Sequence, residues 1–196
     1  MAVVRAFIAI ELPDDIQQRL EQVSDNLQTE MQALPIRWVA VNCAHLTLKF
    51  LGDVSENSVQ MISKILKTEA AQVKPFDVSV GSLGVFPNMR RPRVIWVGVE
   101  AADELHTLQR RIESEVARIG YAPEEREFSP HITVGRVSRN TSHRELREIA
   151  EVLQRQKLGF IGTGHVEAVH LFRSDLKPSG AVYTKLFSAP LLGVEA

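Results

Sequence analysis

The apolar and polar positions of the chain fall into short strand-like runs and longer helical stripes. Residues 5–10 form a short apolar run that predicts a buried strand. From Asp14 to about Met31 the apolar residues recur every three or four positions, which predicts an amphipathic helix with Asp14 and Asp15 at its N-terminus. The same patterns predict a second helix after Ser55 and further strands over residues 36–40, 46–51, 76–86 and 93–99.

The order of elements starts again in the second half of the chain. Apolar spacing predicts a helix over residues 103–119 and a strand over residues 132–134, and Ser142 with Glu145 forms a capping box that opens another helix. Strands over residues 166–172 and 181–187 follow, separated by a turn at residues 177–180.

Landmarks in the two halves are separated by a nearly constant offset, which is 86 for three pairs and 88 for the fourth. These pairs are His45 and His131, Ser55 and Thr141, Phe86 and Phe172, and Arg5 and Arg93. A recurring offset of this size indicates an internal duplication with two copies. We therefore expect residues 1–196 to form a single domain of two intertwined α+β lobes around a central cleft, a concave shape suited to a small ligand.

Composition narrows the class of protein. The 196 residues include 23 Lys and Arg, 24 Asp and Glu and one cysteine, for a formal net charge of −1. Such a balance argues against a long nucleic-acid groove, which needs surplus Lys and Arg, but it is compatible with binding one terminal phosphate. The lone Cys43 excludes a disulfide framework, and Arg5 within the first apolar run argues against a secretory leader. We expect a cytoplasmic monomer with no membrane partner.

The strongest chemical signal is a doubled motif at matching positions of the duplication. Residues 45–48 (HLTL) and 131–134 (HITV) share the pattern His, apolar, Thr, apolar. Two such motifs occur where a chance arrangement of this composition would give well under one. Side chains alternate along a strand, so each copy presents an imidazole and a hydroxyl on one face and packs its apolar residues on the other.

Two imidazoles across a cleft can act as one acid and one base, because their ordinary pKa lies near neutral pH. The hydroxyls of Thr47 and Thr133 can donate hydrogen bonds to phosphoryl oxygens. This set suits an in-line displacement at phosphorus. The near symmetry of the two motifs leaves open which histidine is the acid, and a metal enzyme with two histidine ligands is an alternative that chelation tests.

Three segments resemble the 2H phosphoesterase superfamily, and more closely its RNA 2′,3′-cyclic phosphodiesterase (2′-5′ RNA ligase) branch. They are RAFIAIELP at residues 5–13, HLTLKFLG at residues 45–52 and FSPHITVGR at residues 128–136. The resemblance covers nearly the whole chain. It implies an α+β, bilobal, duplicated fold with pseudo-twofold symmetry, in which two mainly antiparallel sheets with outer helices surround a central cleft.

The resemblance also implies an activity that needs neither metal nor cofactor. RNA 3′ ends with a 2′,3′-cyclic phosphate, such as those of tRNA fragments, would be opened to 2′-phosphomonoesters, with weak ATP-independent 2′-5′ ligation. His45 would be the proton donor to the departing 3′ oxygen and His131 the proton acceptor that activates water. Thr47 and Thr133 would hold the non-bridging phosphate oxygens.

Three further residues are expected to bind substrate. Phe50 and Arg136 each follow their motif histidine by five positions, and in relatives these positions can bracket the terminal base. Because five is odd, a regular strand would turn both side chains away from the histidines, so a bulge or strand end must intervene. Lys49 is expected beside the phosphate. The basic cluster of Arg90, Arg91 and Arg93 could hold an RNA backbone or be a solvated turn.

Two alternative functions remain open at this point. One is hydrolysis of small cyclic nucleotides or of ADP-ribose cyclic phosphate, and the other is a non-catalytic nucleotide- or RNA-binding module. Cys43 is expected to be a small buried residue. The other four histidines are expected to be structural or exposed: His106, His143, His165 and His170.

Overall fold

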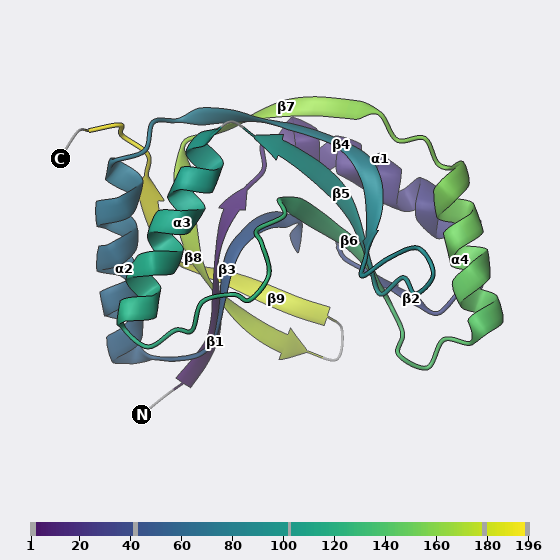
Figure 1. Cartoon of the computed structure of the whole chain (residues 1–196), viewed down its shortest axis with the longest axis horizontal. Helices are drawn as coiled ribbons and strands as arrows, with labels where there is room; N and C mark the ends of the chain where they lie inside the picture. The colour runs from purple at the N-terminus through teal and green to yellow at the C-terminus, as the bar shows by residue number, and fades with distance from the viewer. Residues whose placement is uncertain (1–2, 41–42, 102, 178–179, 195–196) are drawn as a thin grey trace.

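The structure, a computed structural model, describes residues 3–40, 43–101, 103–177 and 180–194 (Figure 1). Within these ranges nine strands form one curled sheet, and four helices lie on its outer side. The first half contains β1 (Val3–Glu11), α1 (Asp14–Glu30), β2 (Ile36–Trp38), β3 (His45–Ser55), α2 (Glu56–Ala71) and β4 (Phe76–Phe86). The second contains β5 (Val94–Ala101), α3 (Asp103–Arg118), β6 (His131–Val137), α4 (His143–Arg155), β7 (Phe160–Val166), β8 (Ala168–Lys177) and β9 (Gly180–Pro190).

The strand order places the two motif strands side by side in the middle of the sheet. The order is β7-β4-β5-β6-β3-β1-β8-β9, and β2 pairs with β6. Strands β3 and β6 are antiparallel and pair only at Leu46 and Ile132. The two sheets expected from the resemblance are therefore joined at this one position into a continuous sheet, with four strands of its main path on each side of the junction.

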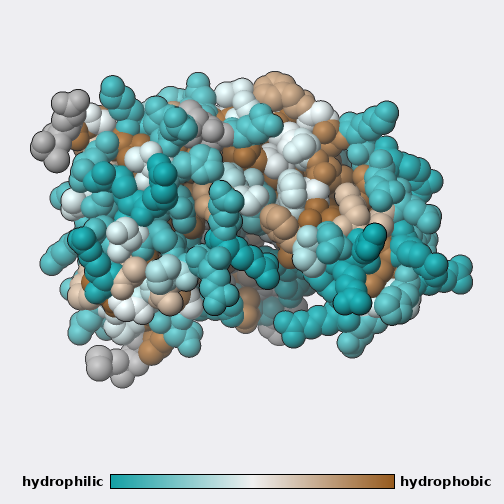
Figure 2. Space-filling model, viewed as in Figure 1, coloured by the Kyte–Doolittle hydropathy of each residue, from teal (hydrophilic) through white to brown (hydrophobic). Residues whose placement is uncertain are grey.

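One helix of each repeat packs beside an element of the other repeat. Helix α1, from the first repeat, packs against β7 of the second repeat, and α3 of the second repeat packs beside α2 of the first. The two helix pairs lie at opposite ends of the molecule (Figure 1). Between these ends the surface is hollowed below the middle of the view (Figure 2). No helix of the described residues is long and apolar enough to cross a membrane.

Local sequence signals account for the starts of α2 and α4 and for the buried face of α1. The Ser55 side chain accepts the backbone N–H of Ser58 at the start of α2. The predicted capping box at α4 is present, because the Ser142 hydroxyl and the Glu145 carboxylate each accept a backbone N–H of the other residue. The predicted stripe of α1 is buried at Ile16, Leu20 and Leu27.

The C-terminal strands differ from the prediction. Residues 160–166 form β7, which the apolar pattern does not reveal, and the predicted strand 166–172 is divided at Glu167 between β7 and β8. On β7 the buried positions facing α1 include Gly162 and Gly164, and a Cβ at Gly162 would collide with Ile16. Glycines occupy two of the three buried positions of this strand, the third being Val166, so hydrophobicity gives little sign of it. The predicted turn at residues 177–180 includes residues 178 and 179, which lie outside the described residues.

Candidate active site

The two motifs lie opposite one another on adjacent antiparallel strands. Extending the Leu46–Ile132 pairing by one residue in each direction sets His45 opposite Thr133 and Thr47 opposite His131. Leu46 and Ile132 are fully buried on the helix side, whereas the four motif side chains are half-buried on the opposite, concave face. Diagonal neighbours in such a pair lie about 7–8 Å apart, a separation across which both imidazoles could reach one phosphate-sized ligand. The prediction that each histidine lies with its threonine on one face of the strand, opposite the apolar residues, is confirmed.

A backbone carbonyl orients each imidazole in the same way. Nδ1 of His45 lies 2.7 Å from the carbonyl oxygen of Cys43, and Nδ1 of His131 lies 2.7 Å from that of Ser129. A carbonyl oxygen can only accept, so each Nδ1 carries the proton and donates it. The Nε2 atom of each neutral imidazole is thereby left with its lone pair for proton transfer.

Aromatic rings support both imidazoles. His45 stacks on Phe7, with ring centroids 4.6 Å apart, and meets the edge of Tyr183 at 5.1 Å. His131 meets the edge of Phe86 at 4.9 Å and has Trp96 at 6.2 Å. Each histidine is thus held in an apolar socket built from its own half of the sheet.

These sockets favour the neutral imidazoles. Burial lowers the pKa of His45 to about 4, against the raising effect of the bond to Cys43, and the Arg136 cation lowers this pKa further. Burial and, less strongly, Arg136 also lower the pKa of His131, against its bond to Ser129. The Arg136 cation thus acts on both imidazoles.

The lowered pKa of His45 predicts a loss of stability in acid. The unfolded chain, with a histidine pKa near 6.5, takes up a proton before the folded protein does. Stability is therefore fully present above pH 6.5 and falls as the pH drops towards 4. Between pH 7 and 4 the free energy of unfolding should fall by about 2–3 kcal/mol more in the wild type than in His45→Gln. Urea unfolding at both pH values measures this difference, and equal losses would contradict the assigned environment of His45.

The predicted bulges are present in both motif strands. Against β1, Thr47 pairs with Ala9 but Lys49 with Ile8, so Leu48 is an extra residue. Against β5, Thr133 pairs with Trp96 but Gly135 with Ile95, so Val134 is extra. Each bulge reverses the side-chain alternation, and the following exposed position returns to the histidine face. The first seven residues of β3 and β6 share one burial pattern as a result.

The bulges bring Phe50 and Arg136 to the concave face. Phe50 is 58% exposed, and its ring centroid lies 6.2 Å from that of Phe7, which stacks on His45. Arg136 is exposed and lies close enough to affect both histidines. Because β3 and β6 are antiparallel, the two residues extend from the histidines in opposite directions. A planar side chain is therefore available on each side of the phosphate position.

The expectation that Lys49 lies beside the phosphate is wrong. Lys49 is 3% exposed, and its Nζ donates to Oε1 of Glu113 at 2.7 Å and to the carbonyl oxygen of Ala122 at 2.6 Å. The bulge at Leu48 that returns Phe50 to the concave face turns Lys49 to the opposite side, towards α3. Lys49 is a structural cation that joins the sheet to α3 and to the segment after it.

We expect Lys49→Met to damage the fold rather than the chemistry. It would leave the Glu113 carboxylate, 17% exposed, without its cation and should lower the free energy of unfolding by about 3 kcal/mol. The kcat/KM per folded molecule should change less than threefold. Urea unfolding and activity assays separate the two effects, and the double variant Lys49→Met/Glu113→Leu should recover most of the stability. A large loss of kcat/KM in folded protein would instead indicate that Lys49 acts at the phosphate position.

Sequence reasoning missed two residues at the concave face. The ring of Tyr183, on β9, packs in T-shaped arrangements against those of His45 and Phe7. Its pKa is raised mainly by burial. Arg37, on β2, lies directly across from Arg136 in the β2–β6 pairing. Neither belongs to a motif, and only the pairing of β2 with β6, and of the β8–β9 hairpin with β1, brings them here.

The remaining candidates lie outside the motif cluster. Arg93 donates to the Ser138 carbonyl oxygen and links the start of β5 to the end of β6, whereas Arg90 and Arg91 are exposed in the turn. Cys43 is half-buried, and its carbonyl oxygen binds His45. The other histidines have structural or surface environments: His106 against the Phe128 ring, His143 exposed, His165 paired with Asp77, and His170 buried beside Ser188.

Comparisons with known proteins agree with this geometry. The family model of LigT-like phosphoesterases matches residues 10–96 and, a second time, residues 97–183. The RNA 2′,3′-cyclic phosphodiesterase of Methanothermobacter thermautotrophicus is 35% identical over 183 residues, which are 93% of this chain and 96% of that protein.

Two solved structures share the fold over almost their whole length. Thermus thermophilus TT0787 superposes with a TM-score of 0.78 at 27% identity, covering 97% of this chain and 100% of that one. E. coli LigT complexed with 3′-AMP superposes with a TM-score of 0.77 at 25% identity, covering 97% and 99%. With the family model matched in two consecutive copies and a relative above 30% identity along nearly the full length, the chain belongs to the LigT-like phosphoesterase family.

Proposed function

We propose that the protein hydrolyses RNA ends carrying a 2′,3′-cyclic phosphate to 2′-phosphomonoesters, by metal-independent acid–base catalysis. The observation that carries the proposal is the pair of carbonyl-anchored imidazoles, each with its Nε2 free, on the face that also bears Thr47 and Thr133. Relatives named RNA 2′,3′-cyclic phosphodiesterase support the choice of substrate.

In this mechanism each motif supplies one proton transfer and one hydrogen-bond donor. His131 accepts a proton from water, whose oxygen attacks phosphorus, while His45 donates a proton to the departing 3′ oxygen. Thr47 and Thr133 donate hydrogen bonds to the non-bridging oxygens, where negative charge grows in the transition state. The P–O3′ bond breaks, and a 2′-phosphate and a 3′-hydroxyl result.

The lowered pKa values of His45 and His131 affect the protonation state from which this cycle starts. Neutral His131 is ready to accept a proton at pH 7, but His45, with a pKa of about 4, is a poor donor before substrate binds. The anionic cyclic phosphate must therefore raise the pKa of His45 on binding. The same steps, with an RNA 5′-hydroxyl in place of water as the nucleophile, would give the weak 2′-5′ ligation.

The direct test is an oligonucleotide with a 2′,3′-cyclic phosphate end, incubated with the protein in a metal chelator. The proposal expects full turnover and a single product that carries a 2′-phosphate. A 3′-phosphate product, or activity lost to the chelator, would overturn it. Binding of 2′-AMP without turnover of any cyclic phosphate would instead indicate a binding module.

The cellular compartment, the oligomeric state and the natural substrate are also part of the proposal. We propose a cytoplasmic monomer in which residues 1–196 act as a single bilobal domain, with RNA 3′ ends such as those of tRNA fragments as substrates. A higher kcat/KM on ADP-ribose cyclic phosphate or on mononucleoside cyclic phosphates than on oligonucleotides would favour the small-molecule alternative.

A further inference from the structure

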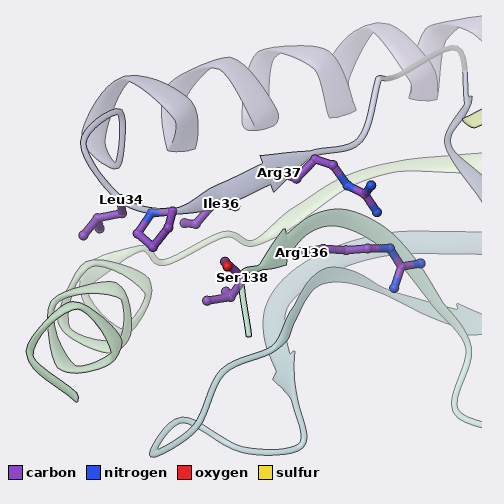
Figure 3. A pocket seen from close by; sticks show the side chains of 7 residues that line it. Leu34, Ile36, Arg37, Arg136 and Ser138 are labelled. Carbon is purple, nitrogen blue, oxygen red and sulfur yellow. The ribbon is translucent and has the colours of Figure 1, made fainter. Parts of the chain in front are cut away.

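Two arginines from adjacent strands point to the same side of the concave face. Arg37 of β2 and Arg136 of β6 are direct partners in the antiparallel pairing, so their side chains leave the sheet on one face. Figure 3 shows both side chains extending in one direction, away from Leu34 and Ser138. Both residues are exposed.

No carboxylate balances this pair of cations among the described residues. Ion pairs occupy Arg111, Arg118 and Arg173, but neither Arg37 nor Arg136 takes part in one there. Both cations, together with Arg5, also counteract part of the rise in the pKa of Tyr183. Tyr183 in turn meets the edge of His45, so both arginines act electrostatically on the surroundings of that histidine. Two like charges held together without a carboxylate favour an anion between them.

A groove begins at the same two arginines and runs away from the histidines. It has a volume of about 480 Å³ and is lined by residues 34–37 and 136–138. Among its lining residues, Leu34, Pro35 and Ile36 are half-buried. Figure 3 places Leu34 and Ser138 at the end opposite to the guanidinium groups. The groove thus offers a charged end near the catalytic residues and a partly apolar end beyond it.

We propose that Arg37, with Arg136, binds the phosphodiester on the 5′ side of the terminal nucleotide, and that the groove receives the preceding nucleoside. This inference rests on the proposed function. A guanidinium can make bidentate hydrogen bonds to a diester phosphate, and the apolar residues among those that line the groove can contact the nucleoside. A mononucleoside cyclic phosphate has no such diester and would leave Arg37 unused. Arg37 is therefore a specificity-determining residue that favours RNA ends over small cyclic nucleotides.

The test compares Arg37→Gln with wild type on two substrates. These are a mononucleoside 2′,3′-cyclic phosphate and a trinucleotide with the same cyclic end. Arg37→Gln should lower kcat/KM at least tenfold more on the trinucleotide than on the mononucleotide. Arg110→Gln, which removes an equivalent charge from the exposed face of α3, is the matched control and should not change the ratio of the two kcat/KM values.

A substrate with an uncharged internucleotide linkage tests whether Arg37 contacts the diester phosphate. In a second trinucleotide the diester next to the terminal nucleotide is a methylphosphonate. Wild type should lose at least tenfold in kcat/KM on this substrate, and Arg37→Gln should show little further loss. Equal losses on both original substrates, or a full additional loss on the methylphosphonate, would overturn the assignment of Arg37. Failure of wild type to hydrolyse any cyclic phosphate would instead overturn the proposed function.

Discussion

Replacing either motif histidine with alanine should lower kcat/KM on a cyclic-phosphate oligonucleotide by about 10²–10⁴-fold. Each imidazole has its Nδ1 fixed by a carbonyl oxygen, so a neighbouring side chain cannot readily take over the position of the missing Nε2. The measurement is initial-rate kinetics in a chelator at neutral pH. Retention of full activity in His45→Ala or His131→Ala would refute acid–base catalysis by this pair.

A sulfur substitution separates the acid from the base. A substrate with sulfur in place of the bridging 3′ oxygen releases a thiolate, which leaves without being protonated. His45→Ala should recover most of its lost rate on this substrate, because its role is to protonate the leaving group. His131→Ala should not recover, since water must still be activated. The reverse pattern would exchange the two roles, which the near symmetry of the motifs leaves open.

Removal of a single motif hydroxyl should give the second largest effect. Thr47→Val and Thr133→Val keep the side-chain shape but remove the donor, and each should lower kcat by about 10²-fold or more. Thr47→Ser and Thr133→Ser, which keep a hydroxyl, should retain most of the activity.

The matched control is Thr163→Val on the edge strand β7, where the threonine is exposed and outside the motifs. It should leave kcat unchanged. If the valine variants at positions 47 and 133 also kept their kcat, the two hydroxyls would not contact the phosphate in the transition state.

The sequence predicts the face that carries the two motifs well because the decisive information is local. Alternation along a strand places each histidine with its threonine, and the odd spacing to Phe50 and Arg136 requires a bulge, which the structure contains at Leu48 and Val134. The same bulge moves Lys49 to the core, a consequence that its position beside the motif conceals.

Features formed by distant segments could not be predicted in this way. Tyr183 reaches His45 only because β8 and β9 extend the sheet beyond β1. Arg37 faces Arg136 through the short pairing of β2 with β6. The edge strand β7 buries Gly162 and Gly164 against α1, so two of its three buried positions carry no apolar side chain for a pattern to detect.

The use of main-chain carbonyls to orient both imidazoles has a consequence for how the protein responds to pH. Where a carboxylate orients a catalytic histidine, the carboxylate's own titration and charge are combined with those of the ring. Here the partners of Nδ1 are the neutral, non-titrating peptide groups of Cys43 and Ser129, and the Arg136 cation lowers the pKa of both rings. The pH–rate profile should therefore contain the ionisations of two imidazoles and no third ionisation from an orienting acid.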